Sequence, residues 1–207
     1  MVKTVERTEA VAAQDVPAPV TLRLRPVIEM TPDQLLEISS LNRDLRLEMT
    51  AEGELIVMAP AGTETGWMNG RIGVRLGLWA ERDGTGVYGD SSTGFTLNGN
   101  AVRSPDASWV LCSRLDALSP EQRRKYAPLC PDFVIELRSP SDRLSVVQAK
   151  MREWLDNGAR LGWLLDPDHK RVYVYQPDTE AQQLDDPKAL SGDPVLPGFV
   201  LNLDEVW

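Results

Sequence analysis

The chain has 207 residues, of which 42% are hydrophobic and 26% are charged, as is typical of a single globular domain. Its formal net charge of −9 at pH 7 argues against binding nucleic acid through bulk positive charge, because phosphate contacts depend on lysine and arginine. No apolar run is long enough to cross a membrane, and the N-terminus lacks the apolar core of a signal peptide. We therefore expect a cytoplasmic protein without a membrane partner.

Cysteine and histidine limit which metal sites and nucleophiles the chain can build. The two cysteines, Cys112 and Cys130, have no CxxC spacing, which favours reduced thiols over a disulfide or a metal site. The single histidine, His169, lies in a Pro-Asp-His-Lys turn, where a solvated histidine is favoured over the base of a Ser-His-Asp triad. The sequence therefore disfavours histidine-rich zinc sites and hydrolases of the triad type.

The N-terminal segment lacks the pattern of a packed element. Residues 16–20 read Val-Pro-Ala-Pro-Val, which favours extended chain over helix because proline restricts the residue before it. We expect residues 1–25 to form a flexible N-terminal tail and residues 26–207 to form a single domain.

A short helix and a β-hairpin are predicted next. Thr31-Pro32 is typical of an N-cap followed by proline at the first helical position. Residues 45–49 alternate apolar and polar side chains, and Glu52-Gly53 supplies the turn to a return strand at 54–59. Because exposed edge strands pair readily with another chain, this added N-terminal hairpin predicts a homodimer.

The longest predicted helix runs from about residue 63 to residue 82 and ends at Asp83-Gly84. Its apolar residues recur at helical spacing on more than one side, at Trp67, Met68, Ile72, Val74, Leu76, Leu78 and Trp79. A helix that is apolar over much of its circumference is expected to be buried.

The rest of the chain alternates short strands with a second long helix. Strands are expected near residues 86–89, 93–97, 106–111, 132–138, 161–165 and 172–175. The helix is expected over 144–155, an irregular connection with a short helix over 113–129, and polar loops with a short apolar end at 199–203 toward the C-terminus. This order predicts an α/β fold in which helices flank a mixed β-sheet.

Two acidic residues stand out in the predicted sheet. Asp106 opens a strand directly after Pro105, although a turn aspartate has the same local pattern. Glu136 and Arg138 share one face of an otherwise apolar strand, and a salt-bridged pair on a half-exposed sheet face is the alternative explanation. Each pattern alone is compatible with a purely structural role.

Lys150 is the cation that the predicted helix places nearest to these acids. The apolar stripe of this helix centres near Leu144 and Met151, and Lys150 lies about 90° from that centre at 100° per residue. A lysine in this position can lay its stem on the core and bring its ammonium group to the sheet edge, and ordinary snorkelling into solvent is the alternative.

Phosphodiester hydrolysis would give these residues a joint purpose. The reaction needs an activated water, in-line attack and neutralised charge on the phosphate. Mg²⁺ prefers oxygen ligands and often takes only one or two carboxylates, which Asp106 and Glu136 could supply from neighbouring strands. The ammonium group of Lys150 could orient the water or stabilise the developing charge.

Three sequence blocks carry a family resemblance: Gly53–Pro60, Arg103–Val110, and Pro131–Pro167, which contains PDFVIELRSPSD and QAKMREWLDNGARLGWLLDP. Together they resemble the Uma-type restriction-endonuclease family of the PD-(D/E)xK nuclease superfamily. The resemblance extends over roughly residues 30 to 203. It implies a restriction-endonuclease-like α/β core and Mg²⁺-dependent chemistry.

The resemblance also implies roles for individual residues. Asp106 matches the first acid of the superfamily motif, and Glu136 matches the second. Position 138 is where the superfamily lysine normally stands, and this chain has Arg138, which is never a neutral base. In similar proteins the lysine can move to the following helix, where Lys150 lies.

Two further acids are candidate ligands of a metal site. Glu64 lies near the start of the predicted helix at 63–82, where a favourable interaction with the helix dipole explains it equally well. Asp132 shares the strand face of Glu136 but lies at the far end of that strand.

The leading hypothesis is a Mg²⁺-dependent endonuclease acting on DNA, with Mn²⁺ as a substitute metal. Asp106 and Glu136 would hold the metal, Lys150 would assist the attacking water, and Arg138 would contact phosphate. One alternative is a nucleic-acid-binding or protein-interaction module on the same fold that has lost cleavage, which Arg138 and the negative charge favour. Another is a hydrolase that acts on small molecules with the same acids and metal.

Overall fold

The protein was analysed as a computed structural model, which describes residues 19–58 and 60–207. The helices are α1 (Pro32–Leu41), α2 (Thr63–Asp83), α3 (Cys112–Asp116), α4 (Pro120–Arg123) and α5 (Leu144–Asp156), with 3₁₀ turns at Asn98–Asn100, Pro167–His169 and Leu203–Glu205. The strands are β1 (Val20–Arg23), β2 (Arg46–Met49), β3 (Glu54–Met58), β4 (Gly86–Asp90), β5 (Phe95–Thr96), β6 (Val102–Arg103), β7 (Ala107–Leu111), β8 (Phe133–Leu137), β9 (Leu161–Asp166), β10 (Arg171–Tyr175), β11 (Gln182–Asp185), β12 (Ala189–Ser191) and β13 (Val200–Asn202).

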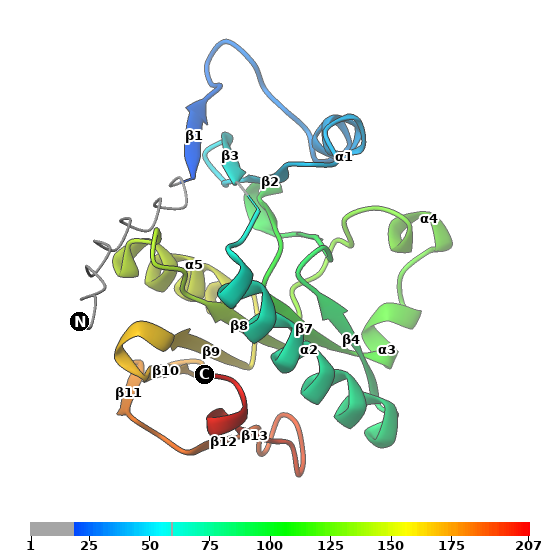
Figure 1. The fold of residues 1–207 in the computed structure, drawn as a ribbon. Helices are drawn as coiled ribbons and strands as arrows, with labels where there is room; N and C mark the ends of the chain where they lie inside the picture. Colours follow the sequence, from blue (N-terminus) through cyan, green and yellow to red (C-terminus); the bar gives the residue numbers. More distant parts are fainter. Residues whose placement is uncertain (1–18, 59) are drawn as a thin grey trace, which may run out of the picture.

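A six-stranded mixed sheet forms the centre of the molecule, with the order β11-β10-β9-β8-β7-β4 (Figure 1). Only β8 and β9 are parallel among its neighbouring strands in the described residues, and α5 is the crossover between them. Such a connection needs a long crossover segment, which α5 provides. The predicted α/β fold with a mixed sheet flanked by helices is therefore confirmed.

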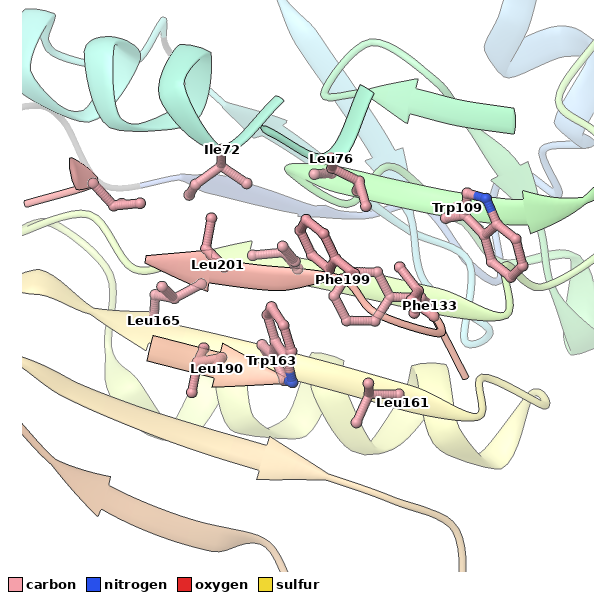
Figure 2. Close-up of a cluster of buried hydrophobic side chains, with 14 of the residues drawn as sticks. Ile72, Leu76, Trp109, Phe133, Leu161, Trp163, Leu165, Leu190, Phe199 and Leu201 are labelled. Carbon is pink, nitrogen blue, oxygen red and sulfur yellow. The ribbon is translucent and has the colours of Figure 1, made fainter. Parts of the chain in front are cut away.

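The two long helices cover opposite faces of this sheet. Ile72 and Leu76 of α2 belong to one buried cluster with Phe133 of β8 and Trp163 of β9, and Figure 2 shows these side chains between helix and sheet. On the other face, Met151 and Trp154 of α5 pack with Val134, Leu164 and Tyr173. The alternation of side chains along β8 and β9 produces this division, because successive residues point to opposite faces.

Local sequence explains where the helices begin and end. The hydroxyl of Thr31 accepts a hydrogen bond from the Gln34 amide, and the Gln34 side chain bonds back to the Thr31 amide, which forms a capping box at the start of α1. Gly84 ends α2 with φ of 70°, in the left-handed region that glycine adopts without strain. Both predicted helix boundaries are confirmed.

A second sheet lies beside the first, with the order β1-β3-β2-β6-β5. The predicted hairpin is present as β2 and β3, although position 59 lies outside the described residues. The prediction that its edges are exposed is wrong, because β1 pairs with β3 and β6 pairs with β2. The homodimer stays a prediction, without the hairpin as its interface.

The predicted tail and the C-terminal loops differ from the structure in extent. Residues 1–18 lie outside the described residues, but Val20–Arg23, which was included in the tail, forms β1 because its backbone bonds fill the open edge of β3. The strands β11 and β12 occur where polar loops were predicted, and β13 forms within the short apolar end predicted at 199–203. They are short and mostly exposed, so their sequences lack the apolar alternation of a buried strand.

In the described part of the chain, none of the helices combines the length and the apolar character that a membrane crossing requires.

Aromatic packing in the cluster under α2 gives a direct test of this core. Trp163 is 1% exposed, lies edge-on to Phe133 with ring centroids 4.8 Å apart, and stacks on Phe199 at 5.9 Å. We predict that Trp163→Ala lowers the free energy of unfolding by about 3–5 kcal/mol, measured by urea denaturation, because it leaves a large cavity. The matched control is Trp67→Ala, since Trp67 is 67% exposed, and its effect should stay within about 0.5 kcal/mol. Similar losses in the two variants would contradict this description of the core.

Candidate active site

Asp106 lies immediately before β7 and forms hydrogen bonds with the two residues that flank Glu136 in β8. Its backbone amide donates to the Ile135 carbonyl at 3.0 Å, and its Oδ2 accepts from the Leu137 amide at 2.8 Å. Its Oδ1 accepts from Arg46 of β2 at 3.2 Å. The carboxyl group of Asp106 is therefore fixed against the end of β8 and against the second sheet.

Glu136 points from β8 toward α5, where Lys150 and Trp154 lie one helical turn apart. The Lys150 Nζ is 3.0 Å from Oε1 and 3.1 Å from Oε2 of Glu136, and the Trp154 indole donates to Oε1 at 2.8 Å. Residues four apart on a helix lie on the same face, so both donors reach one carboxylate. Glu136 is 4% exposed, and the structure brings it together with Lys150 as the sequence analysis expected.

Lys150 also reaches the second sheet. Its ammonium donates to Glu48 Oε1 of β2 at 2.9 Å and to the backbone carbonyl of Ser104 at 3.0 Å. Glu48 is 2% exposed and forms an ion pair with Arg103 at 3.1 Å. One ammonium group thus connects α5, β8, β2 and the segment that leads to Asp106.

Burial and unequal pairing separate the pKa values of the two buried glutamates. Burial would raise the pKa of Glu48, but the nearby charges of Lys150, Arg103 and Arg46 lower it to about 2. Burial raises the pKa of Glu136 to about 7; Lys150 opposes this rise, and the carboxylates of Asp106 and Glu48 add to it. The positive charge near Glu136 is therefore too small to offset burial, whereas the positive charge near Glu48 is sufficient.

A family model matches residues 32–204, which is most of the chain. This is the Uma2 family, described as "Putative restriction endonuclease". The chain belongs to the Uma2 family. The resemblance expected from the sequence blocks is thereby confirmed.

A solved structure supports the fold of this Uma2 chain. It is similar to a crystal structure titled as that of a "putative nuclease belonging to DUF820" from Anabaena variabilis ATCC 29413, with a TM-score of 0.69 and 21% sequence identity. The likeness covers 86% of this chain and 97% of that chain, and at this identity it shows the fold alone. Comparison with curated proteins produced no match.

Arg138, at the position of the superfamily lysine, is bonded elsewhere. Its Nη1 donates to Asp166 Oδ1 at 2.8 Å, and its Nε donates to the Asp142 carbonyl at 3.2 Å. Asp166, which is 1% exposed, also lies 2.9 Å from His169 Nδ1. Within the described ranges, no hydrogen bond or ion pair joins Arg138 to Asp106, Glu136 or Lys150.

The two further acids do not join the cluster. Glu64 is exposed in the first turn of α2, and among the described residues no hydrogen bond or ion pair links it to Asp106 or Glu136. Asp132 is buried at the start of the β8 strand, where it accepts from the Leu111 amide at 3.0 Å and pairs with Arg114 at 3.1 Å. Asp132 therefore lies at the opposite end of the strand from the carboxylate cluster, as its position in the sequence predicted.

Arg46, Glu48 and Asn69 also belong to the site, although they were not among the residues predicted for it. Arg46 and Glu48 are the polar members of the alternation at 45–49, which was interpreted only as evidence for a strand. An acid and a base two residues apart on one strand face form the same pattern as Glu136 and Arg138, so this signal was available. Asn69 of α2, whose Nδ2 is 3.4 Å from Asp106 Oδ1, had no such signal.

The donor atoms around Asp106 fit a hard divalent cation such as Mg²⁺. They are carboxylate oxygens, with Asn69 Oδ1 as a nearby buried acceptor that has no hydrogen-bond partner. No group of three or more His, Cys, Asp and Glu side chains is close enough to hold a metal anywhere in residues 19–58 and 60–207. A cation held by the two carboxylates would therefore complete its coordination with amide, backbone or water oxygens, as Mg²⁺ commonly does.

The raised pKa of Glu136 predicts how stability depends on pH without metal. The pKa of Glu136 in the folded chain is about 7, above the ordinary value of 4.5, so the folded state is favoured when this carboxyl group is protonated. This contribution to the free energy of unfolding is fully present below pH 4.5 and is lost as pH rises through 7. In EDTA, wild type should lose about 2 kcal/mol relative to Glu136→Gln between about pH 5.5 and pH 8, measured by urea denaturation.

The matched control for this experiment is Glu48→Gln. Glu48 has a pKa of about 2 in the folded chain, so it stays ionised over the whole interval. The stability difference between wild type and Glu48→Gln should therefore be nearly the same at both pH values. A pH-independent difference for Glu136→Gln as well would show that Glu136 is ionised at neutral pH.

Proposed function

We propose that this Uma2 protein is a Mg²⁺-dependent endonuclease that hydrolyses DNA phosphodiester bonds, with Mn²⁺ as a substitute metal and with Asp106 and Glu136 as the metal ligands. The observation that carries the proposal is the position of Asp106 beside β8, where its carboxylate accepts a hydrogen bond from the amide that follows Glu136, while Glu136 lies against the ammonium group of Lys150. Membership of a family described as "Putative restriction endonuclease" supports a nuclease.

Lys150 acts as a permanent cation in this proposal. Burial would lower its pKa, but the carboxylates of Glu136 and Glu48 raise the pKa above its ordinary value, so the group stays charged. A charged ammonium cannot accept a proton from water, and its role is to orient the attacking water and to stabilise negative charge on the phosphate. Glu48 and the Ser104 carbonyl hold the ammonium in position for this role.

Bound between the carboxylates, the metal would polarise the phosphate and lower the pKa of a coordinated water. Asp106 is held for ligation by Arg46 and by the Leu137 amide, and Glu136 by the Trp154 indole. Such preorganised ligands avoid the cost of reorienting during the reaction.

Arg138 is proposed as a phosphate contact and not as a replacement for the catalytic lysine. Its hydrogen bonds to Asp166 and Asp142 use Nη1 and Nε, and no hydrogen bond of Nη2 occurs in the described part of the chain. A guanidinium with one free edge can still donate to a phosphate oxygen. Its fixed charge excludes it as a base.

Plasmid cleavage tests the proposal. Purified protein incubated with supercoiled DNA and Mg²⁺ or Mn²⁺ should nick or linearise it, and EDTA should prevent this. Asp106→Ala and Glu136→Ala should each reduce the rate at least about 100-fold, because transition-state charge loses its main stabilisation. Asp204→Ala is the control, since Asp204 is exposed and its pair with Lys188 lies on the C-terminal segment.

The outcomes separate the alternatives left open by the sequence. Cleavage that survives both alanine substitutions would reject the assigned site. Mn²⁺ uptake that depends on Asp106 and Glu136, without cleavage of any DNA, would favour a binding module. Hydrolysis of a small phosphodiester, with DNA left intact, would favour a small-molecule hydrolase.

A further inference from the structure

A cavity of about 570 Å³ lies over the β4 end of the central sheet. α5 contacts β8, β9 and β10, whereas α3 contacts β4 and β7 at the other end of the sheet (Figure 1). The residues that line the cavity belong to this β4 and β7 end, so the cavity lies beyond the edge of α5. Its walls come from the 92–95 loop, α3, the segment 123–127 and Leu36 of α1. This space is not part of the carboxylate cluster described above.

The floor of the cavity is apolar and open. It consists of Val87 and Gly89 of β4 and of their register partners Val110 and Ser108 of β7. Val87 is 49% exposed, although it lies on a sheet face that α5 covers further along. At Gly89, a Cβ atom would lie 2.6 Å from Ser108 Oγ and 3.1 Å from Thr93 Cβ, so these two side chains pack directly against the glycine and form this part of the floor.

The cavity lies on the same sheet face as Glu136 and adjoins the candidate active site. Ser108 pairs with Val134 of β8, and Val134 is two residues before Glu136 on the same face of that strand. On the wall, a Cβ atom at Gly94 would lie 3.4 Å from Ser104 Oγ, and the Ser104 carbonyl accepts from Lys150. A ligand in the cavity would therefore be close to a phosphate held at the carboxylates.

The rim of the cavity carries the only run of three consecutive lysine or arginine residues in the chain, Arg123, Arg124 and Lys125. Arg123 pairs with Asp116 at 3.5 Å, and Lys125 pairs with Asp33 at 2.9 Å, but all four side chains are substantially exposed. Exposed pairs of this kind contribute little and can exchange for a phosphate. Arg124 forms no ion pair with any residue that the structure describes.

We propose that this cavity binds one unpaired base of the DNA substrate while the 123–125 run contacts the adjoining phosphates, an inference that rests on the proposed function. A base offers flat apolar faces to Val87 and Val110. The N–H groups of its polar edge can donate to the hydroxyl oxygens of Ser92 and Thr93 on the wall, which themselves donate to Asp90. Enzymes that place a base in such a pocket take it from a single strand or extrude it from the duplex. The substrate is accordingly DNA with an unpaired nucleotide beside the cleaved bond.

Oligonucleotide binding tests the proposal without requiring cleavage. Two fluorescent oligomers of equal length are compared by anisotropy in the presence of Ca²⁺: single-stranded oligothymidine and an oligomer of abasic units with the same phosphates. Wild type should bind the thymidine oligomer about tenfold more tightly, because the abasic oligomer has nothing to place in the cavity.

Substitutions test whether the preference for the thymidine oligomer arises at the cavity. Val87→Trp fills the cavity from a half-exposed position and should weaken thymidine binding about tenfold while leaving abasic binding unchanged. Val200→Trp is the matched control, since Val200 is a 58% exposed strand valine outside the cavity, and it should change neither affinity. Arg124→Ala should weaken both oligomers alike and reduce the salt dependence of binding by about one phosphate contact.

Equal affinities of wild type for the two oligomers, or thymidine binding that Val87→Trp leaves unchanged, would overturn the proposal. If Val87→Trp does not fold, failure of Arg124→Ala to weaken either oligomer would overturn it. Base-dependent binding lost in Val87→Trp would uphold the cavity even if no DNA is cleaved, and only the proposed nuclease function would then fail. Cleavage of plasmid without base-dependent binding would reject the cavity alone.

Discussion

The Lys150 ammonium joins three separate parts of the molecule at one buried point. It donates to Glu48 of the second sheet, to the Ser104 carbonyl before β7, and to Glu136 of the central sheet. Buried charges are costly unless each has partners in good geometry, and these contacts supply such partners where the two sheets and α5 meet. The same constraint that orders the fold also brings Asp106 and Glu136 to one place, and the candidate chemistry depends on it.

This arrangement also explains how an acidic chain can be a candidate for binding DNA. Arg46, Arg103, Arg138 and Lys150 are all engaged in ion pairs inside the protein, so they add little to the surface potential. In the proposed function, contacts with phosphate then depend on a metal at the carboxylates, on the Nη2 of Arg138 and on a few exposed cations such as those at 123–125. A protein of this kind should bind DNA weakly without metal, because few counterions are released.

Local patterns were sufficient to predict much of the fold. Capping residues and apolar periodicity located α1, α2 and α5, and strand alternation placed Glu136 on the face opposite the apolar side of β8. The pairing of β1 with β3 and the strands β11 to β13 could not be predicted, because short exposed strands depend on backbone bonds to a neighbour and not on a distinctive sequence. For the site, spacing and resemblance pointed to Asp106, Glu136 and Lys150 as candidates. Glu48 was missed because its alternation with Arg46 was interpreted only as a strand pattern, and because its contact with Lys150 spans 102 residues.

The location of a bound ion tests the central claim most directly. Crystals of the wild-type protein soaked in Mn²⁺ and measured for anomalous scattering should show one strong peak with oxygen atoms of both Asp106 and Glu136 about 2.1 Å away, close to Mg²⁺ ligand distances. Lys150 should remain beside Glu136 in that structure. An ion bound to neither carboxylate, or carboxyl groups that face separate regions while Mn²⁺ is bound elsewhere, would contradict the account.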